Sequence, residues 1–543
     1  PRWQSRARTA GWPWSTSVGW ARQHQVRSRA AQRPACQTQP RPTEHEAVQS
    51  VFDEVYSEPP GRELWGIRQF VIRCLAVTAL TSILLGYDIG IWGAAHIKVQ
   101  RRFNLSDTEV SVLVGILNLT SAVGGLFCSW TSERLGRRKT VAMACGLFIA
   151  GSFFKCLAQS YASLMVGRTI TGIGVGVGMA IAPLYGAELA PKRYRGGLVT
   201  LTEIAINVGI FLGYIIGWAF SGLDDNTSWR LMLAMGAFPP FVILLGLRGM
   251  PDSPRWLVRQ NRELDAARAL ARAADRAEAD EAMAELRRLK HFREESWRDF
   301  IFPSTSGVRR LLLAGIGTAF MQQASGIEAQ VYYTPEILES AGMTSEEQRL
   351  QGQMLVGAVK VLFILVPLRL LDHPSPWFGR VNFLIASGLG MAIGQTMLAI
   401  NFTGGNSSIG LALTAQCVYM AFFSLGYGPI TWVLTGEVFP LRLRGKAMGV
   451  ATFVNRITSG LIATLFPVMA ASMTTAGVFG LFAAFAVVSA IFAAVAVPET
   501  KGRSLEEIEQ SVGGSEPRPS VMVSLSADYA THIDEDQAAS ATA

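Results

Sequence analysis

Long apolar runs broken by single charges are the feature that most constrains the fold of this chain. Residues 74–97 contain one acid, Asp88, and no base apart from a histidine, while residues 447–498 contain one base, Arg456. Only 17% of the 543 residues are charged, against about 25% in a typical soluble domain. Because a helix needs about 20 mainly apolar residues to cross a bilayer, these runs predict membrane-spanning helices. The run 447–498 is long enough for two.

The apolar runs predict an all-α membrane protein with twelve spanning helices, six on each side of a polar segment at 251–308. That segment is rich in Ala, Arg and Glu between 262 and 295, which favours short amphipathic helices. The twelve predicted helices cover 70–97, 109–130, 140–158, 162–187, 197–221, 229–249, 309–334, 352–371, 381–401, 409–435, 446–470 and 475–497.

A charged nonapeptide occurs twice. The pattern Glu-x-x-Pro-x-Arg-x-Arg-Gly stands at 188–196 and again at 437–445, 249 residues later. A second pair, at 251–255 and 498–503, has nearly the same offset. Such duplication predicts two pseudo-symmetric six-helix bundles, an organisation typical of secondary transporters.

Basic loops set the expected orientation. Arg and Lys gather at 134–139, 192–195 and 442–446, which the twelve-helix prediction places on one side of the membrane. The positive-inside rule puts this side and both termini in the cytoplasm. We expect a plasma-membrane protein, with the vacuolar or plastid membrane as alternatives.

The chain outside the two bundles divides into polar segments. Residues 1–43 carry eight Arg and no acid, which is typical either of an organelle-targeting segment or of a disordered tail outside the mature protein. The predicted organisation is a basic disordered tail at 1–65, bundles at 66–250 and 309–500, a cytoplasmic helical linker at 251–308 and a cytoplasmic tail at 501–543.

Six charged residues lie well inside the predicted spans, where each costs at least about 2.5–3.5 kcal/mol on insertion scales. They either pair to hold helices together or line a polar cavity that binds a hydroxylated solute and a proton. Arg168 is the only obvious cation in the same half as Asp88. We expect the two to pair in one state and protonation of Asp88 to break the pair. The six are Asp88, Arg168, Glu203, Glu328, Lys360 and Arg456.

A series of short motifs over about 66–510 resembles the sugar porter family of the major facilitator superfamily. Each motif is modest alone, but their order and spacing are specific to that family. They are Gly86-Tyr87-Asp88-Ile89-Gly90, Gly136-Arg137-Arg138, Gly167-Arg168, the repeat at 188–196, Pro251-Asp252-Ser253-Pro254-Arg255-Trp256, Gln322-Gln323-Ala324-Ser325-Gly326-Ile327, Gly428-Pro429-Ile430-Thr431-Trp432 and Pro498-Glu499-Thr500-Lys501-Gly502-Arg503.

Within that family the chain is most similar to the plant-type polyol and monosaccharide proton symporters. Those proteins share the acid at Asp88, where facilitative glucose carriers have Asn, so the resemblance implies proton coupling through Asp88 and Arg168. Glu203, Glu328 and Lys360 fill positions that hold neutral amides in most sugar porters. Glu328 and Lys360 either bind hydroxyls or neutralise each other.

The resemblance also implies a substrate site. Amide side chains both donate and accept hydrogen bonds and therefore suit sugar hydroxyls, and an aromatic face covers the apolar side of the sugar ring. The implied substrate-binding residues are Glu203, Gln322, Gln323, Glu328, Lys360, Trp432 and Asn455.

The repeated motifs resemble the ion pairs that hold the two halves of family members together on the inside when the cavity opens outward. Here the second Asp-x-x-Gly-Arg-Arg copy is interrupted by an insertion after Asp372, and Val381 replaces its last Arg. The implied inner-gate residues are Arg137, Glu188, Arg195, Arg380, Glu437 and Arg444.

The sequence thus predicts a proton-coupled symporter of polyols or monosaccharides that works by alternating access, acts as a monomer and needs no cofactor. An uncoupled carrier would keep every sugar motif, and a membrane sugar sensor is disfavoured by the short segment after Gly502. The sequence shows no nucleophile elbow, P-loop or metal-ligand spacing, so we expect no enzyme and no metal site. The basic charge lies in the N-terminal tail and does not indicate nucleic-acid binding.

Overall fold

The computed structural model describes residues 44–57, 63–64, 67–190, 195–290, 296–303, 305–371, 373, 375–404, 407–440, 442–503 and 507–508. These residues are helical apart from turns, connecting segments and a hairpin of β1 (Glu63–Leu64) and β2 (Ile67–Arg68). The structure does not describe residues 1–43, to which the two interpretations of the N-terminal segment apply, nor most of the tail after 503.

The first half of the protein consists of six spans. Helix α5 contains Pro183, and the sixth span is interrupted by a single 3₁₀ turn, η2, ahead of Pro239 and Pro240. The elements are α2 (Gln69–Phe103), α3 (Asp107–Leu135), α4 (Arg137–Cys156), α5 (Tyr161–Leu189), α6 (Arg195–Ser221) and α7 (Asp225–Ala234) with η2 (Met235–Ala237) and α8 (Phe238–Gly246).

The second half repeats this arrangement with more interruptions. The elements are α13 (Ser306–Ala324), α14 (Ile327–Tyr332), α15 (Thr334–Ser340), α16 (Glu346–Leu370), η3 (Pro376–Phe378), α17 (Arg380–Asn401), α18 (Ile409–Leu425), α19 (Tyr427–Val438) and α20 (Arg444–Ala496).

The predicted number of spans is confirmed. Ten described helical segments are long and apolar enough to cross a membrane. Segment α20 counts as two spans, because Met473 and Thr474 leave the helical region of φ/ψ space. The row α13–α15 supplies the twelfth. The prediction of one continuous helix at 309–334 is wrong, because Gly326, at φ +89°, separates α13 from α14.

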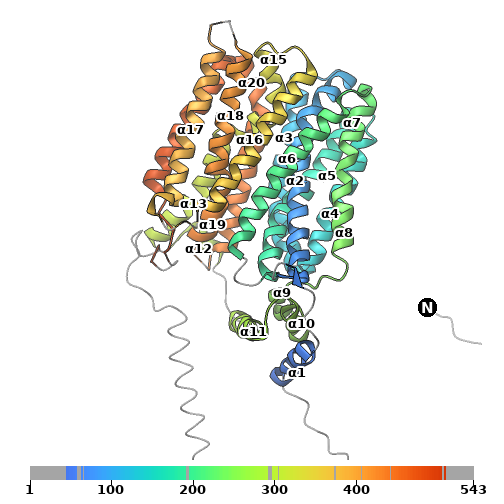
Figure 1. Cartoon of the computed structure of the whole chain (residues 1–543), viewed down its shortest axis with the longest axis vertical. Helices are drawn as coiled ribbons and strands as arrows, with labels where there is room; N and C mark the ends of the chain where they lie inside the picture. The colour runs from blue at the N-terminus through green and yellow to red at the C-terminus, as the bar shows by residue number, and fades with distance from the viewer. Residues whose placement is uncertain are drawn as a thin grey trace, which may run out of the picture.

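The two halves stand side by side, with the linker helices at one end (Figure 1). We call that end the linker face and the opposite end the far face. Across the boundary, α3 packs on α20 and α6 packs on α16. Small residues permit this approach: a Cβ added at Gly115 of α3 would lie 1.8 Å from Oγ1 of Thr464 on α20.

The linker contains α9 (Pro254–Arg259), α10 (Glu263–Ala273), α11 (Arg276–Lys290) and α12 (Trp297–Ile301), in agreement with the predicted amphipathic helices. Helix α1 (Glu44–Ser57) packs on α10 and buries Phe52 completely. The Tyr56 hydroxyl donates to the carbonyl of Ala274 at 2.8 Å. The prediction of a disordered tail over all of 1–65 is therefore wrong for 44–57, where apolar side chains at helical spacing find a partner surface on the linker.

Candidate functional site between the two halves

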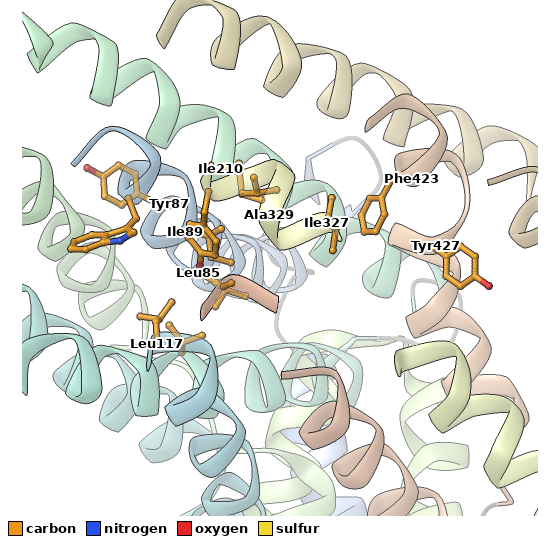
Figure 2. Packing of buried hydrophobic residues seen from close by; sticks show 14 of the residues in the cluster. Leu85, Tyr87, Ile89, Leu117, Ile210, Ile327, Ala329, Phe423 and Tyr427 are labelled. Atoms are coloured by element: carbon orange, nitrogen blue, oxygen red, sulfur yellow. The ribbon is translucent and has the colours of Figure 1, made fainter. Parts of the chain in front are cut away.

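A cavity lies between the two halves. Its unfilled space is about 570 Å³, part of it open to solvent. Figure 2 shows Leu85, Ile89 and Ile210 on one side and Ile327 and Phe423 on the other, and all five line the cavity. The polar and aromatic part of the lining is Glu203, Asn207, Gln322, Gln323, Glu328, Lys360, Trp432 and Arg456.

Six of the seven predicted substrate residues line this cavity, and Asn455 is the exception. Asn455 is fully buried behind the glutamines on α13. Its Nδ2 donates to Oε1 of Gln322 at 2.8 Å, and its Oδ1 accepts from Nε2 of Gln323 at 3.2 Å. Arg456 also donates to this Oδ1. In this structure both ends of the Asn455 amide therefore hold cavity-lining side chains, and its substrate contact stays a prediction.

Two amide oxygens of the lining are buried with no hydrogen-bond partner among the described residues. They are Oε1 of Gln323 and Oδ1 of Asn207. Burying an acceptor without a partner costs about 1–3 kcal/mol, so each is available to a hydroxyl donor in the cavity. Sequence reasoning missed Asn207, although it lies one helical turn after Glu203, whose carbonyl accepts from its Nδ2 at 2.8 Å.

The charged lining is spread around the cavity. Glu328 accepts a 2.6 Å hydrogen bond from the Ser459 hydroxyl, and the Lys360 ammonium lies 5.5 Å from the centre of the Phe423 ring. No described ion pair within 4.0 Å joins Glu328 to Lys360, so the two charges do not touch in this structure, and the two alternatives for them stay open. The charges of Glu328 and Glu203 both act on Lys360 through space.

Asp88 lies on the side of α2 that faces α4 and α5. Its Oδ1 accepts a short hydrogen bond from Nζ of Lys155, and its Oδ2 lies 3.6 Å from Nη1 of Arg168. Arg168 is fully buried, stacks 4.0 Å from the centre of the Trp92 ring, and donates to two backbone carbonyls of α3. The predicted proximity of Asp88 and Arg168 is present.

The expectation that Arg168 is the only cation near Asp88 is wrong. Lys155 is fully buried at the end of α4. A lysine three residues before the end of a predicted span, here 140–158, is usually interpreted as an anchor that extends to the membrane surface. Only the packing of α4 on α5, which places Gly167 against the Lys155 stem, turns its ammonium inward.

The repeated motifs form two equivalent clusters at the linker face. Arg137 forms a bidentate ion pair with Glu188, with N–O distances of 2.8 and 3.0 Å. Arg380 forms the same kind of pair with Glu437, at 3.3 and 3.0 Å. The insertion after residue 372 does not prevent the second pair.

Each of these pairs stays within one half, so they do not tie the halves together in this structure. The carboxylates of Asp252 and Glu499 accept the backbone N–H groups of Arg137 and Arg380 in the two copies. Arg444 donates to the carbonyl of Phe439 in its own half. The side chain of Arg195 lies outside the described part of the chain.

The described ion pairs that cross between the halves are at the far face. His96 contacts Glu336, and Lys98 and Arg101 contact Glu346 at 3.5 and 2.8 Å. Helix α2 extends to Phe103, beyond the predicted end at 97, and Lys98 reaches Asp225 at 2.9 Å. The far face is therefore held closed.

Comparison with known proteins agrees with this architecture. Residues 74–512 match the family model described as "Sugar (and other) transporter". Polyol transporter 5 of Arabidopsis thaliana is 39% identical over 485 residues, which cover 84% of this chain and 88% of the relative. Probable polyol transporter 4 of the same plant is 40% identical over 467 residues, with the same coverage of 84% and 88%.

The proton:xylose symporter XylE of E. coli, solved with 6-bromo-6-deoxy-D-glucose, matches this fold with a TM-score of 0.70 at 28% identity. The match covers 82% of this chain and 99% of the symporter. The predicted resemblance is confirmed by the family model, the curated relatives and the solved structure alike. The chain belongs to the sugar porter family of the major facilitator superfamily, and it is a multi-pass membrane transporter of sugars or polyols, not an enzyme.

Proposed function

We propose that this protein is a proton-coupled symporter of polyols or monosaccharides that works by alternating access. The linker face is the cytoplasmic side, in keeping with its basic loops, and the closed far face makes this an inward-facing state. The halves at 66–250 and 309–500 rock about the cavity to expose it alternately to the two sides. A single chain contains the whole site, so the monomer is the transporting unit, and the plasma membrane is its expected location.

The cavity lining supports a hydroxylated, uncharged substrate. Amides on both sides of the cavity offer donors and acceptors, and the unpartnered oxygens of Gln323 and Asn207 suit hydroxyl donors. Trp432 offers an aromatic face to the C–H groups of the substrate. The charged lining contains two acids and two bases, which sum to zero when all are ionised, and therefore disfavours a substrate with net charge.

The observation that carries the coupling proposal is the position of Asp88 on α2. Leu85 and Ile89 of the same helix line the cavity, while Asp88 faces the cations of α4 and α5. A change in the charge of Asp88 alters how α2 is held by its own bundle, and a substrate in the cavity contacts that same helix. The similarity to the proton:xylose symporter XylE supports the coupling.

The test is uptake of labelled hexoses, pentoses and linear polyols into proteoliposomes, with and without an inwardly directed proton gradient. Coupling predicts accumulation above the outside concentration only when the gradient is present. Uptake that merely equilibrates, and that a protonophore does not change, indicates a facilitator and contradicts the proposal. A protein that binds one of these solutes without moving it would be a sensor.

Asn455→Leu is expected to raise the substrate KM at least tenfold. Leucine has a similar volume but cannot hold the amides of Gln322 and Gln323, and it leaves buried polar atoms without partners, at a cost of about 1–3 kcal/mol each. Initial uptake rates over a range of substrate concentrations measure the effect. Asn382→Leu, at an exposed site near the linker face, serves as the matched control. An unchanged KM would show that Asn455 does not position the site.

A further inference from the structure

The carboxylate of Asp88 contacts a second cation, Lys155. Proton coupling through Asp88 and Arg168 alone gives this lysine no role. We propose that an Asp88–Lys155 couple holds the proton exchanged during transport, and that Lys155 is the group that releases it. Arg168 supplies a fixed positive charge beside the couple. This inference rests on the proposed proton coupling and names the residue that carries the proton.

The three side chains form a closed cluster. The side chains of Lys155, Asp88 and Arg168 are 1%, 4% and 0% exposed. Nζ of Lys155 donates to one oxygen of Asp88, and the other oxygen faces Nη1 of Arg168 at 3.6 Å, beyond hydrogen-bonding distance. Neither that oxygen nor Nη1 has a hydrogen-bond partner among the described residues. Lys155 therefore makes the direct contact, and Arg168 acts through its charge.

Counting charges shows which group exchanges the proton. With all three groups ionised the cluster carries a net charge of +1. Loss of a proton from Lys155 leaves a neutral cluster, whereas addition of a proton to Asp88 raises the charge to +2. Because uncompensated charge is costly in a buried site, the accessible change is between +1 and 0, and the proton that leaves belongs to Lys155.

The two cations, Lys155 and Arg168, differ in how readily they lose a proton, in keeping with these roles. A guanidinium stays protonated in proteins, while a buried ammonium can become neutral. Arg168 is further fixed by its two hydrogen bonds to carbonyls of α3 and by the Trp92 ring. Within the described part of the chain Lys155 has one hydrogen-bond partner, the carboxylate, and it is the penultimate residue of α4, beside the far-face end of the bundle.

Other ionisable groups surround the cluster. Tyr87 and His96 lie on α2, and their interactions with Asp88 and Arg168 are electrostatic. Arg230 of α7 donates to the carbonyl of Cys156, next to Lys155. The hydroxyls of Tyr332 and Tyr333 face Arg168 from the other half. Among these described neighbours histidine is the residue type whose reference pKa is nearest to neutral, and His96 is engaged by Glu336.

The test compares Lys155→Arg with Lys155→Met in proteoliposomes, and measures accumulation driven by a proton gradient relative to substrate counterflow in the same preparation. Arginine keeps the positive charge but cannot release the proton. We expect its ratio of accumulation to counterflow to fall at least tenfold. With methionine, Asp88 must titrate against Arg168 alone, so we expect coupling to persist with its pH midpoint displaced by about one unit or more. Lys139→Arg, on the exposed end of the same helix, is the control and should behave as wild type.

The outcomes separate the two proposals. If wild type does not accumulate substrate in a proton gradient, the coupling proposal fails. If wild type accumulates and both Lys155 variants do so with the wild-type pH midpoint, Lys155 is only a packing residue and this inference is overturned. Should Lys155→Arg show no counterflow because arginine does not fit, the midpoint of Lys155→Met decides: a displaced midpoint supports the inference, and an unchanged one refutes it.

Discussion

Asp88→Asn protein in proteoliposomes is expected to show at least a tenfold lower accumulation of substrate in an inward proton gradient. Asparagine has nearly the shape of aspartate but carries no charge with which to hold the exchanged proton on Lys155, so transport would no longer draw on the gradient. For wild type, initial uptake should rise as the pH on the far-face side falls from about 8 to 6, because protonation precedes substrate translocation. The variant should lose most of this dependence.

The same substitution leaves Lys155 and Arg168 buried without a counter-charge. Breaking a buried pair in this way typically costs about 3–5 kcal/mol, so Asp88→Asn is also expected to unfold at a lower temperature. The double variant Asp88→Asn/Lys155→Met removes one of the two uncompensated charges and should recover part of the lost stability without recovering accumulation. Asp107→Asn, at an exposed site, is the matched control. Wild-type accumulation by Asp88→Asn would refute coupling through this residue.

The sequence predicts the spans well because hydrophobic length is decisive for a membrane helix. It does not reveal interruptions. The break between α13 and α14 depends on the positive φ of Gly326, and nothing in the apolar pattern of 309–334 distinguishes this glycine from the others. Helix α1 was missed for a related reason: its apolar face is stable only against α10, so local composition alone indicates a polar tail.

Those residues of the site that are charged and lie inside a predicted span could be predicted from the sequence. Glu203, Glu328 and Lys360 stand out because such residues are costly in a membrane, and all three line the cavity. Asn207 is a neutral amide with no such signal. A motif match also cannot tell which amide touches a ligand and which supports another amide, and Asn455 is of the second kind in this structure.

The repeated nonapeptide shows what duplication does and does not preserve. Both copies place a Glu against an Arg at the linker face, Glu188 with Arg137 and Glu437 with Arg380. The halves therefore keep the same local structure where they meet the linker. The halves differ in the charges inside their spans, since the first half carries Asp88 and Arg168 and the second carries Lys360 and Arg456.

Gly115→Trp is expected to reduce transport at least tenfold by preventing closure of the far face. In the closed state the α3 backbone at Gly115 lies against α20, and a Cβ there would lie 1.8 Å from Oγ1 of Thr464 and 2.7 Å from the carbonyl of Gly460. An indole requires the two helices to separate, which an outward-facing state permits. The protein should then be trapped open on the far side and bind substrate without releasing it inward.

Two measurements test this trap: uptake, and the distance between spin labels at the exposed far-face residues Asp107 and Glu347, one in each half. The variant should show lower uptake and a distance distribution shifted to longer values. Gly146→Trp is a stringent control, because a Cβ at Gly146 of α4 meets no atom within 4 Å and the same bulk should be accommodated there. If Gly115→Trp transports as well as Gly146→Trp, contact of α3 with α20 at this level is not needed for the cycle, and the closed far face described here is not an obligatory state of transport.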